Sequence, residues 1–188
     1  MEAIILAGGK ATRLGEAARG QPKALVPVAG HPIAAYQVAQ LARAGVRRVI
    51  VSCAAGQEDV FTERLGGLGV EIACAPESEP LGRGGGLRLA ADAREEAGPL
   101  FALNGDELHD VDLAAMLEAH RRRSAAATIV VAPLVSQFGV VELAEERKLY
   151  AFRHEGLWIT VNTPKDLQRA EEHHAELPVP ITGSAGPA

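Results

Sequence analysis

The chain has 188 residues, of which 47% are hydrophobic, and this length is enough for one globular domain with a sizeable core. Its 24 acidic and 19 basic side chains give a net charge of −5, which argues against non-specific binding to nucleic acid. No apolar run approaches the roughly 20 residues of a membrane helix, and Met1 and Glu2 lead directly into an apolar run, so we expect no signal peptide, no membrane partner and a cytoplasmic protein.

The first predicted element is a buried strand at residues 3–6, an apolar run that ends in Ala7, Gly8 and Gly9. Glycines at the end of a buried strand let backbone N–H groups approach an anion, because no Cβ stands in the way. Three cations follow: Lys10, Arg13 and Lys23. This combination suits a polyphosphate, although it matches neither the Walker A pattern nor the dinucleotide-binding fingerprint.

Helices and strands are expected to alternate along the following chain. Strands are predicted at residues 48–52, 70–73, 100–103 and 127–133, and helices at 33–44, 57–65, 87–97 and 113–124. This order predicts a mostly parallel sheet with helices on both faces. Ligands bind outside the carboxyl ends of the strands in such sheets, where the loops after Leu6 and Leu103 both lie. Cys53 and Cys74 lack metal-binding spacing and are predicted to be small buried residues.

A glycine-rich stretch at residues 77–86 precedes the helix predicted at 87–97. Its glycines are either flexible filler or a way for the backbone to approach a flat ligand closely. Turns alone rarely need so many glycines, so we favour the ligand-binding interpretation.

A third candidate element is Asp106, just past the strand predicted at 100–103. A carboxylate at this position can hold Mg²⁺, which binds through one or two carboxylates plus substrate phosphates. Asp110 and Asp112 are expected to cap the following helix, and His109 is expected to be an exposed loop residue. Glu107 is left without a role.

Two ordered motifs in the first 32 residues, L-A-G-G-x-x-T-R-L and P-K-x-L-x-P-V-x-G-x-P, resemble the signature of the nucleoside-triphosphate-dependent nucleotidyltransferases. Within that group the chain is most similar to the sugar-1-phosphate nucleotidylyltransferases. The resemblance implies a three-layer, Rossmann-like α/β nucleotidyltransferase fold. We expect one such domain over residues 1–176 and a loose tail at 177–188. One departure is Ala11, where many members of the family have glycine.

The resemblance also implies roles for individual residues. Arg13 and Lys23 would be catalytic, and Asp106, in an L-N-G-D motif, would hold the metal. The stretch 77–86 resembles the base-recognition motif E/Q-x-x-P-x-G-T-x-G-A, except that Arg83 replaces threonine. The nucleotide-binding residues implied by these motifs are Leu6, Ala7, Gly8, Gly9, Glu77, Gly82 and Asn104.

The C-terminal third departs from the family pattern. Residues 138–142 and 149–152 resemble the hairpin beneath the sugar, with Gly139 at a sugar-contacting position. The W-x-D-x-G-T-P-x-D closing motif has Thr160 in place of the second metal-binding aspartate and Asn162 in place of glycine. The stretch between Asp106 and this motif is about half as long as is usual in the family. Independently of function, Thr163 and Asp166 are expected to cap a final helix.

The expected function is transfer of a nucleotidyl group from a nucleoside triphosphate, with GTP weakly favoured, to a phosphorylated acceptor such as a sugar-1-phosphate. Mg²⁺ would be the cofactor and pyrophosphate the other product, and a homo-oligomer is left open. Two alternatives remain. The chain resembles the tails of compact guanylyl- or cytidylyltransferases of cofactor precursors, and loss of the second aspartate would also suit a nucleotide-binding regulatory homologue without catalysis.

Overall fold

The computed structural model describes residues 1–9, 11–18, 20–133 and 149–178. The chain divides into two compact units, one formed by Met1–Leu108 with Ile159–Ala188 and the other by His109–Trp158. The single domain expected over residues 1–176 stays a prediction. In the segment expected to be a loose tail, Leu177 is buried, and residues 179–188 lie outside the described part of the chain.

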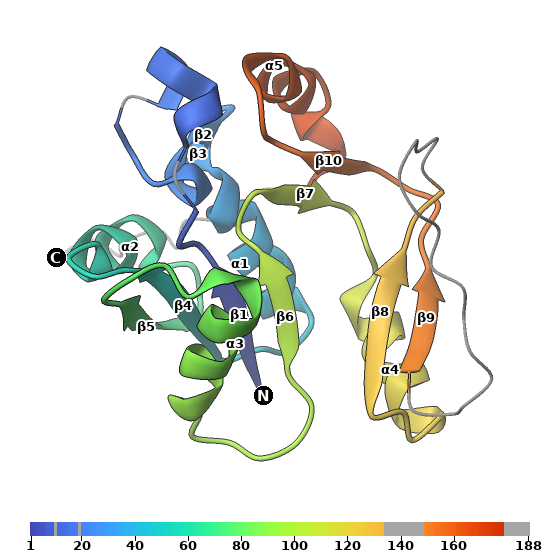
Figure 1. Cartoon of the computed structure of the whole chain (residues 1–188). Coiled ribbons are helices and arrows are strands. Elements are labelled where there is room, and N and C mark those ends of the chain that lie inside the picture. The colour runs from blue at the N-terminus through green and yellow to red at the C-terminus, as the bar shows by residue number, and fades with distance from the viewer. Residues whose placement is uncertain (10, 19, 134–148, 179–188) are drawn as a thin grey trace, which may run out of the picture. The chain divides into compact units, whose positions relative to one another are not determined.

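A four-stranded parallel sheet forms the centre of the first unit (Figure 1). It consists of β1 (Glu2–Leu6), β4 (Arg48–Ala54), β5 (Glu71–Glu77) and β6 (Phe101–Asn104), in the order β5-β4-β1-β6. β1 pairs in parallel with β4 on one side and with β6 on the other. The predicted parallel α/β fold is therefore confirmed, and the predicted strands of this sheet differ from the observed ones mainly at their ends.

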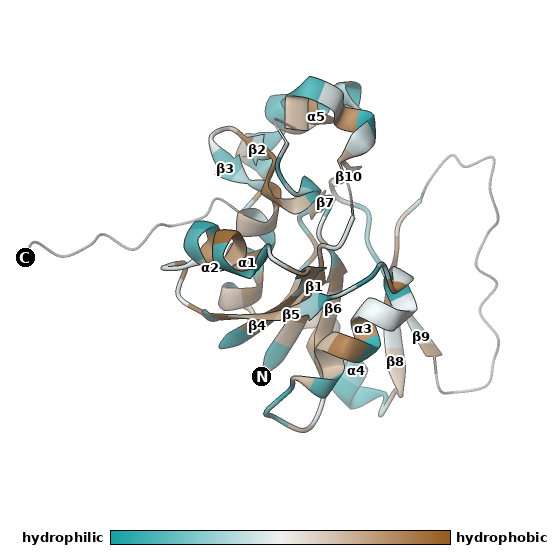
Figure 2. Cartoon of the chain, turned by 60° about the vertical axis from the view of Figure 1, so that its left-hand side comes forward, coloured by the Kyte–Doolittle hydropathy of each residue, from teal (hydrophilic) through white to brown (hydrophobic). Residues whose placement is uncertain are grey.

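Helices cover both faces of this sheet. α1 (Ile33–Arg43) and α2 (Glu58–Leu65) lie on one face, whereas α3 (Gly82–Asp92) lies on the other, as Figures 1 and 2 show. The chain proceeds from β1 to β4 and β5 in one direction and then returns to β6 on the opposite side of β1. The strand order thus reverses between β1 and β6, and the carboxyl ends of these strands form a topological switch point.

The core of the first unit explains the apolar runs of the sequence. Ile4 on β1 and Ile50 on β4 are fully buried and pack with Ala75 and Ala90. Both faces of the sheet are covered, so its central strands read as continuous apolar runs rather than alternating ones. In Figure 2 these strands are mainly pale or brown, whereas teal marks polar parts of α2 and α5.

The final helix, α5 (Pro164–Glu172), begins as predicted. The Thr163 side chain accepts a hydrogen bond from the Asp166 N–H, and the Asp166 carboxylate accepts one from the Thr163 N–H, which makes a capping box. The remaining elements of the first unit are short. They are η1 (Thr12–Ala18), η2 (Lys23–Leu25), β2 (Pro27–Val28), β3 (His31–Pro32) and η3 (His174–Glu176). Two further strands, β7 (Glu107–His109) and β10 (Trp158–Thr160), pair with each other.

The second unit contains α4 (Leu113–Arg122), β8 (Ala127–Val131) and β9 (Leu149–Arg153). β8 and β9 are parallel neighbours. The Asp112 carboxylate accepts a hydrogen bond from the Ala115 N–H at 2.8 Å, which confirms its predicted capping role. The expected partner strand at residues 138–142, with Gly139, lies outside the described residues.

His109 and Asp110 correct two sequence-based expectations. His109 is buried rather than exposed, and its ring stacks on Trp158 with centroids 5.0 Å apart. Burial lowers the pKa of His109 to about 4, helped by the charge of His154. Asp110 does not cap the helix; its carboxylate lies 3.0 Å from Nε2 of His154. These residues therefore stabilise the second unit.

α3 and the cysteines also differ from expectation. α3 starts at Gly82 and ends at Asp92, so the predicted helix at 87–97 is displaced by five residues. Cys53 is buried, as predicted, but Cys74 is only half-buried. Among the described residues, no helix is long and apolar enough to cross a membrane.

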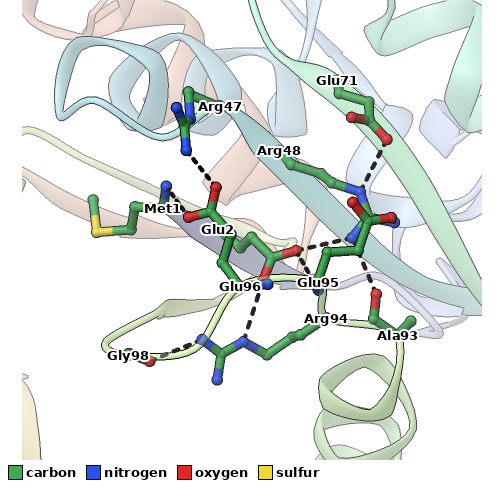
Figure 3. A network of polar contacts seen from close by, with 10 residues as sticks. All are labelled: Met1, Glu2, Arg47, Arg48, Glu71, Ala93, Arg94, Glu95, Glu96 and Gly98. Carbon is green, nitrogen blue, oxygen red and sulfur yellow. Dashed lines mark hydrogen bonds and ion pairs between the residues drawn. The ribbon is translucent and has the colours of Figure 1, made fainter.

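A buried carboxylate at the amino end of β1 ties the sheet to the segment after α3 (Figure 3). The Glu2 carboxylate accepts hydrogen bonds from the backbone N–H groups of Glu95 and Glu96, each at 3.0 Å, and from Arg48 at 2.9 Å. Burial alone would raise the pKa of Glu2, but these donors outweigh it and lower the pKa to about 2. The Glu2 carboxylate is therefore ionised in the folded state at neutral pH.

Candidate active site

The glycine loop after β1 begins where the sheet's central strands end. The Ala7 N–H donates to the carbonyl of Ser52 at 2.7 Å, and the Gly105 N–H donates to the carbonyl of Leu6 at 2.8 Å. A Cβ at Gly105 would lie 2.9 Å from the Leu6 carbonyl oxygen, so glycine permits this close approach. The loops after β1 and β6 are therefore held side by side at the switch point.

A cavity of about 260 Å³ opens between these loops. It is lined by every residue to which the sequence assigned a catalytic, nucleotide-binding or metal-binding role, except Arg13. The full lining is Leu6, Ala7, Gly8, Gly9, Lys23, Ala24, Glu77, Pro80, Gly82, Arg83, Asn104, Gly105 and Asp106. Four separate segments of the sequence thus meet at one place.

A second cavity, of about 440 Å³, shares part of this lining. Gly8, Gly9, Glu77 and Pro80 line both cavities. The remaining lining residues come from 11–22, 54–57 and 78–79. Glycines therefore line both cavities, and Glu77 belongs to the lining of each.

Lys23 occupies the centre of the polar contacts. Its Nζ lies 2.6 Å from Oδ2 of Asp106 and 2.6 Å from Oδ1 of Asn162. The Lys23 side chain is 12% exposed and that of Asp106 is 24% exposed, so this ion pair is partly shielded from solvent. A positive charge is therefore fixed at the edge of the cavity, where an anion can reach it.

The loop that carries Asp106 is held by hydrogen bonds from two amide side chains. Nε2 of Gln37, a buried residue of α1, donates to the carbonyls of Asn104 and Glu107, each at 2.7 Å. The Asn104 amide donates to Oε1 of Glu107 at 3.1 Å. Burial raises the pKa of Glu107, and the nearby charge of Asp106 adds to the rise.

The donor set suits a magnesium ion bound together with a nucleotide. Within the described residues there is no group of three or more His, Cys, Asp or Glu side chains that could hold a metal alone. Asp106 offers one carboxylate beside a cavity lined by Gly8 and Gly9, and Mg²⁺ commonly uses one or two carboxylates plus phosphates. The residues present therefore fit Mg²⁺ as a companion of bound phosphates.

Glu77 is positioned as a hydrogen-bond acceptor between the two cavities. Its Oε1 accepts from the Ser52 hydroxyl at 2.6 Å, and its Oε2 accepts from the Leu81 N–H at 3.0 Å. Gly8 stands directly beside it, since a Cβ there would lie 3.0 Å from Oε1 of Glu77. The carboxylate is thus oriented by the protein, and each oxygen keeps lone-pair capacity for a ligand.

The remaining basic residues fall into three cases. Arg13, on η1, is exposed and lines neither cavity, so its assigned role rests on the resemblance alone. Lys10 lies outside the described residues. Arg83 lines the smaller cavity although the sequence analysis gave it no role. The sequence did not place Arg83 in the first turn of α3, because this helix was predicted to begin at residue 87.

Comparison with known proteins gives the family. The sequence matches the family model described as nucleotidyl transferase over residues 2–154. The chain is 34% identical over 158 residues to mannose-1-phosphate guanylyltransferase of Mycobacterium tuberculosis, covering 81% of this chain and 43% of the relative. It is 37% identical over 147 residues to mannose-1-phosphate guanylyltransferase catalytic subunit beta of Xenopus tropicalis, covering 75% and 41%. The chain thus spans less than half the length of these relatives.

Solved structures share the fold. A UTP-bound UGPase from Acinetobacter baumannii superposes with a TM-score of 0.78 at 16% identity, covering 92% of both chains. HddC from Yersinia pseudotuberculosis, complexed with GMP-PN, gives a TM-score of 0.75 at 20% identity, covering 92% of this chain and 99% of that chain. With the family match over most of its length, the chain belongs to the nucleotidyl transferase family.

Proposed function

We propose that this chain transfers a nucleotidyl group from a nucleoside triphosphate to a sugar-1-phosphate and releases pyrophosphate. One observation carries the proposal: Lys23 Nζ lies 2.6 Å from Asp106 Oδ2 at the rim of a glycine-walled cavity at the switch point. Nucleotidyl transfer needs no protein nucleophile, because the acceptor phosphate itself attacks the α-phosphorus. Fixed positive charge beside free backbone donors is the equipment that such a reaction requires.

The residues would divide the work as follows. The backbone N–H groups of Gly8 and Gly9 would bind phosphate oxygens, and Lys23 would neutralise charge between the α-phosphate and the acceptor phosphate. Arg13 would bind the leaving pyrophosphate, for which a guanidinium offers paired donors. Asp106 would hold Mg²⁺, which supplies further charge neutralisation on the phosphates when bound.

GTP is the nucleotide that Glu77 favours. Guanine presents two adjacent donors on one edge, its ring N–H and its exocyclic amine. The Glu77 carboxylate, oriented by Ser52 and Leu81, presents two acceptor oxygens that match such a pair. The relatives that are mannose-1-phosphate guanylyltransferases support the same base and suggest mannose-1-phosphate as the first acceptor to test.

The test is pyrophosphate release with Mg²⁺, offering each of the five common nucleoside triphosphates against sugar-1-phosphates and against cofactor-precursor phosphates. We expect release with GTP and a sugar-1-phosphate. Release only with a cofactor-precursor phosphate would show that the acceptor is of that class and not a sugar-1-phosphate. No release in any well, with nucleotide binding intact, would refute the transfer activity and favour the regulatory alternative suggested by Thr160.

A further inference from the structure

The hydroxyl of Ser52 is a polar group inside an apolar strand. Ser52 lies on β4 between the buried residues Val51 and Cys53, and it is itself fully buried. A buried hydroxyl costs free energy unless it is hydrogen-bonded. The Ser52 hydroxyl donates to Oε1 of Glu77 at 2.6 Å. This buried polar group is therefore paired with a side chain that lines both cavities.

The strand register brings Ser52 and Glu77 to the same face of the sheet. β4 pairs in parallel with β5, with Ser52 opposite Ala75 and Ala54 opposite Glu77. Side chains alternate between the two faces along a strand, so Ser52, Ala75 and Glu77 share one face. Ala75 packs there with Ala90 of α3. The hydrogen bond between Ser52 and Glu77 thus lies on the face that α3 covers.

Gly86 provides the space that this hydrogen bond needs. It is a buried residue of α3, and a Cβ at this position would lie 2.6 Å from Oε1 of Glu77 and 2.8 Å from Oγ of Ser52. Its φ is not positive, so alanine would displace these two side chains without straining the backbone. The motif that residues 77–86 resemble ends in alanine, whereas this chain has glycine there. The bond from Ser52 therefore accompanies a departure of this chain from the family motif.

Glu77 is held at both of its carboxylate oxygens. Oε1 accepts from the Ser52 hydroxyl, and Oε2 accepts from the Leu81 N–H at 3.0 Å. The terminal torsion of a glutamate side chain is broad, so one bond alone would leave the carboxylate free to turn, whereas two bonds fix its plane. Guanine presents a ring N–H and an exocyclic amine side by side, and it needs two acceptors in one plane.

We propose that Ser52 determines the preference for guanine, as a positioning residue that fixes the plane of the Glu77 carboxylate, and that Gly86 leaves the room for this arrangement. The inference rests on the proposed function, because it takes Glu77 to bind the base. Ser52 lines neither cavity and therefore acts through Glu77. Without the hydroxyl, the carboxylate is held by Leu81 alone and offers one well-placed acceptor instead of two.

A purely structural role for Ser52 gives different results. If Glu77 only satisfies a buried hydroxyl, removing that hydroxyl would change the affinities for all nucleotides by the same factor. ITP separates the two cases, because its base keeps the ring N–H of guanine and lacks the exocyclic amine. The ratio of the affinities for GTP and ITP thus measures whether both donors are bound.

The experiment measures the affinities for GTP and ITP by calorimetry in wild type, Ser52→Ala, Gly86→Ala and Gly84→Ala. We expect wild type to bind GTP about tenfold or more tightly than ITP, the scale of one hydrogen bond to a charged group. Ser52→Ala and Gly86→Ala should each reduce this ratio to about threefold or less, because the carboxylate can then turn. An unchanged ratio in Ser52→Ala would overturn the proposal.

Gly84→Ala is the matched control for Gly86→Ala. It makes the same change on the same helix, but a Cβ at Gly84 would meet nothing within 4 Å, and Gly84 lines neither cavity. Its ratio should equal that of wild type. Thermal unfolding establishes that each variant is folded, and Ser52→Ala, which only removes an atom, tests the proposal even if Gly86→Ala does not fold.

Pyrophosphate release separates this inference from the proposed function. The expected ratios without release for any acceptor would refute the transfer activity and support positioning by Ser52. Release with GTP, together with an unchanged ratio in Ser52→Ala, would refute positioning alone. A wild-type ratio near one would refute the binding of both guanine donors by Glu77, and the role of Ser52 with it.

Discussion

Arg83 adds a cation to the wall of the smaller cavity, where the family's base-recognition motif has threonine. Its side chain is exposed, and it makes no hydrogen bond or ion pair with any residue that the structure describes. Its charge nevertheless reaches Glu107, whose pKa it lowers against the larger effect of burial. An unpaired guanidinium beside a phosphate-binding loop is available to a phosphate oxygen.

We therefore predict that Arg83→Thr weakens binding of GTP by about tenfold, the scale of losing one charge-assisted hydrogen bond. Affinity is measured by calorimetry for GTP and for guanosine, and the loss should be confined to GTP. Arg88→Thr, on the exposed surface of the same helix and lining neither cavity, makes the same charge change as a control. Equal affinities for the two variants would refute a phosphate contact by Arg83.

The sequence predicted the residues of the candidate site better than it predicted their long-range contacts. The motifs identified most residues that line the smaller cavity, because these residues lie at the end of a predicted strand or in a glycine-rich or proline-rich stretch. The contact between Lys23 and Asn162 spans 139 residues and connects two motifs, so no local pattern indicates it. His109 was misjudged for the same reason: its stacking partner, Trp158, lies far along the chain.

At the scale of elements, the start of α3 is a case in which helix propensity gives the wrong residue. Glycine is a poor helix former, so the pattern placed the helix start after the glycines, at residue 87. In the structure the helix begins at Gly82, and the Leu81 N–H bonds to Glu77 just ahead of it. Tertiary context therefore sustains a helical turn that the local sequence disfavours, and this turn brings Arg83 to the cavity.

A substitution at Gly84 measures how much glycine within α3 lowers the free energy of unfolding. A Cβ at Gly84 would meet nothing within 4 Å, and its φ is not positive. Gly84→Ala should therefore raise the free energy of unfolding by roughly 0.5–1 kcal/mol, as expected for alanine in place of glycine in a helix. Urea titration with circular dichroism measures the change.

Gly105→Ala is the contrasting variant. A Cβ at Gly105 would lie 2.9 Å from the Leu6 carbonyl oxygen and 3.0 Å from Cβ of Ala24, so the two loops must move apart. We expect a decrease in the free energy of unfolding of about 1–3 kcal/mol. A stabilising effect of Gly105→Ala, or a destabilising one of Gly84→Ala, would contradict this account of the two glycines.

At the scale of the whole molecule, the two units should respond to acid over different pH ranges. In the first unit, the pKa of Glu2 is about 2, below the ordinary value of 4.5, because backbone and arginine donors outweigh burial. Its carboxylate therefore stabilises the fold fully above pH 4.5, and this stabilisation is lost as the pH falls from 4.5 towards 2.

Glu2→Gln should remove this part of the pH dependence. At pH 7 it should also lower the free energy of unfolding by about 1–3 kcal/mol, because buried donors lose a charged acceptor. Urea titrations of wild type and variant at several pH values measure both effects. Parallel stability curves for the two proteins between pH 4.5 and pH 2 would contradict the role of Glu2.

In the second unit, His109 makes stability fall on acidification, over a pH range above that of Glu2. Burial lowers its pKa from 6.5 to about 4, so between these values the unfolded chain binds a proton that the folded unit does not. Stability should fall as the pH decreases from 6.5 to 4. His109→Phe keeps an aromatic ring against Trp158 and cannot titrate, so its near-ultraviolet signal should stay constant over this range; a loss equal to that of wild type would refute the assignment.

The cavity between the ends of β1 and β6 is proposed to be a nucleotidyl-transfer site centred on Lys23. The most direct measurement is the turnover of Lys23→Ala beside wild type, with Mg²⁺, GTP and the best sugar-1-phosphate. Loss of one charge-stabilising donor predicts at least about a hundredfold lower turnover, with the fold intact by circular dichroism. Near-normal turnover of Lys23→Ala would contradict the account and move the chemistry away from this cavity.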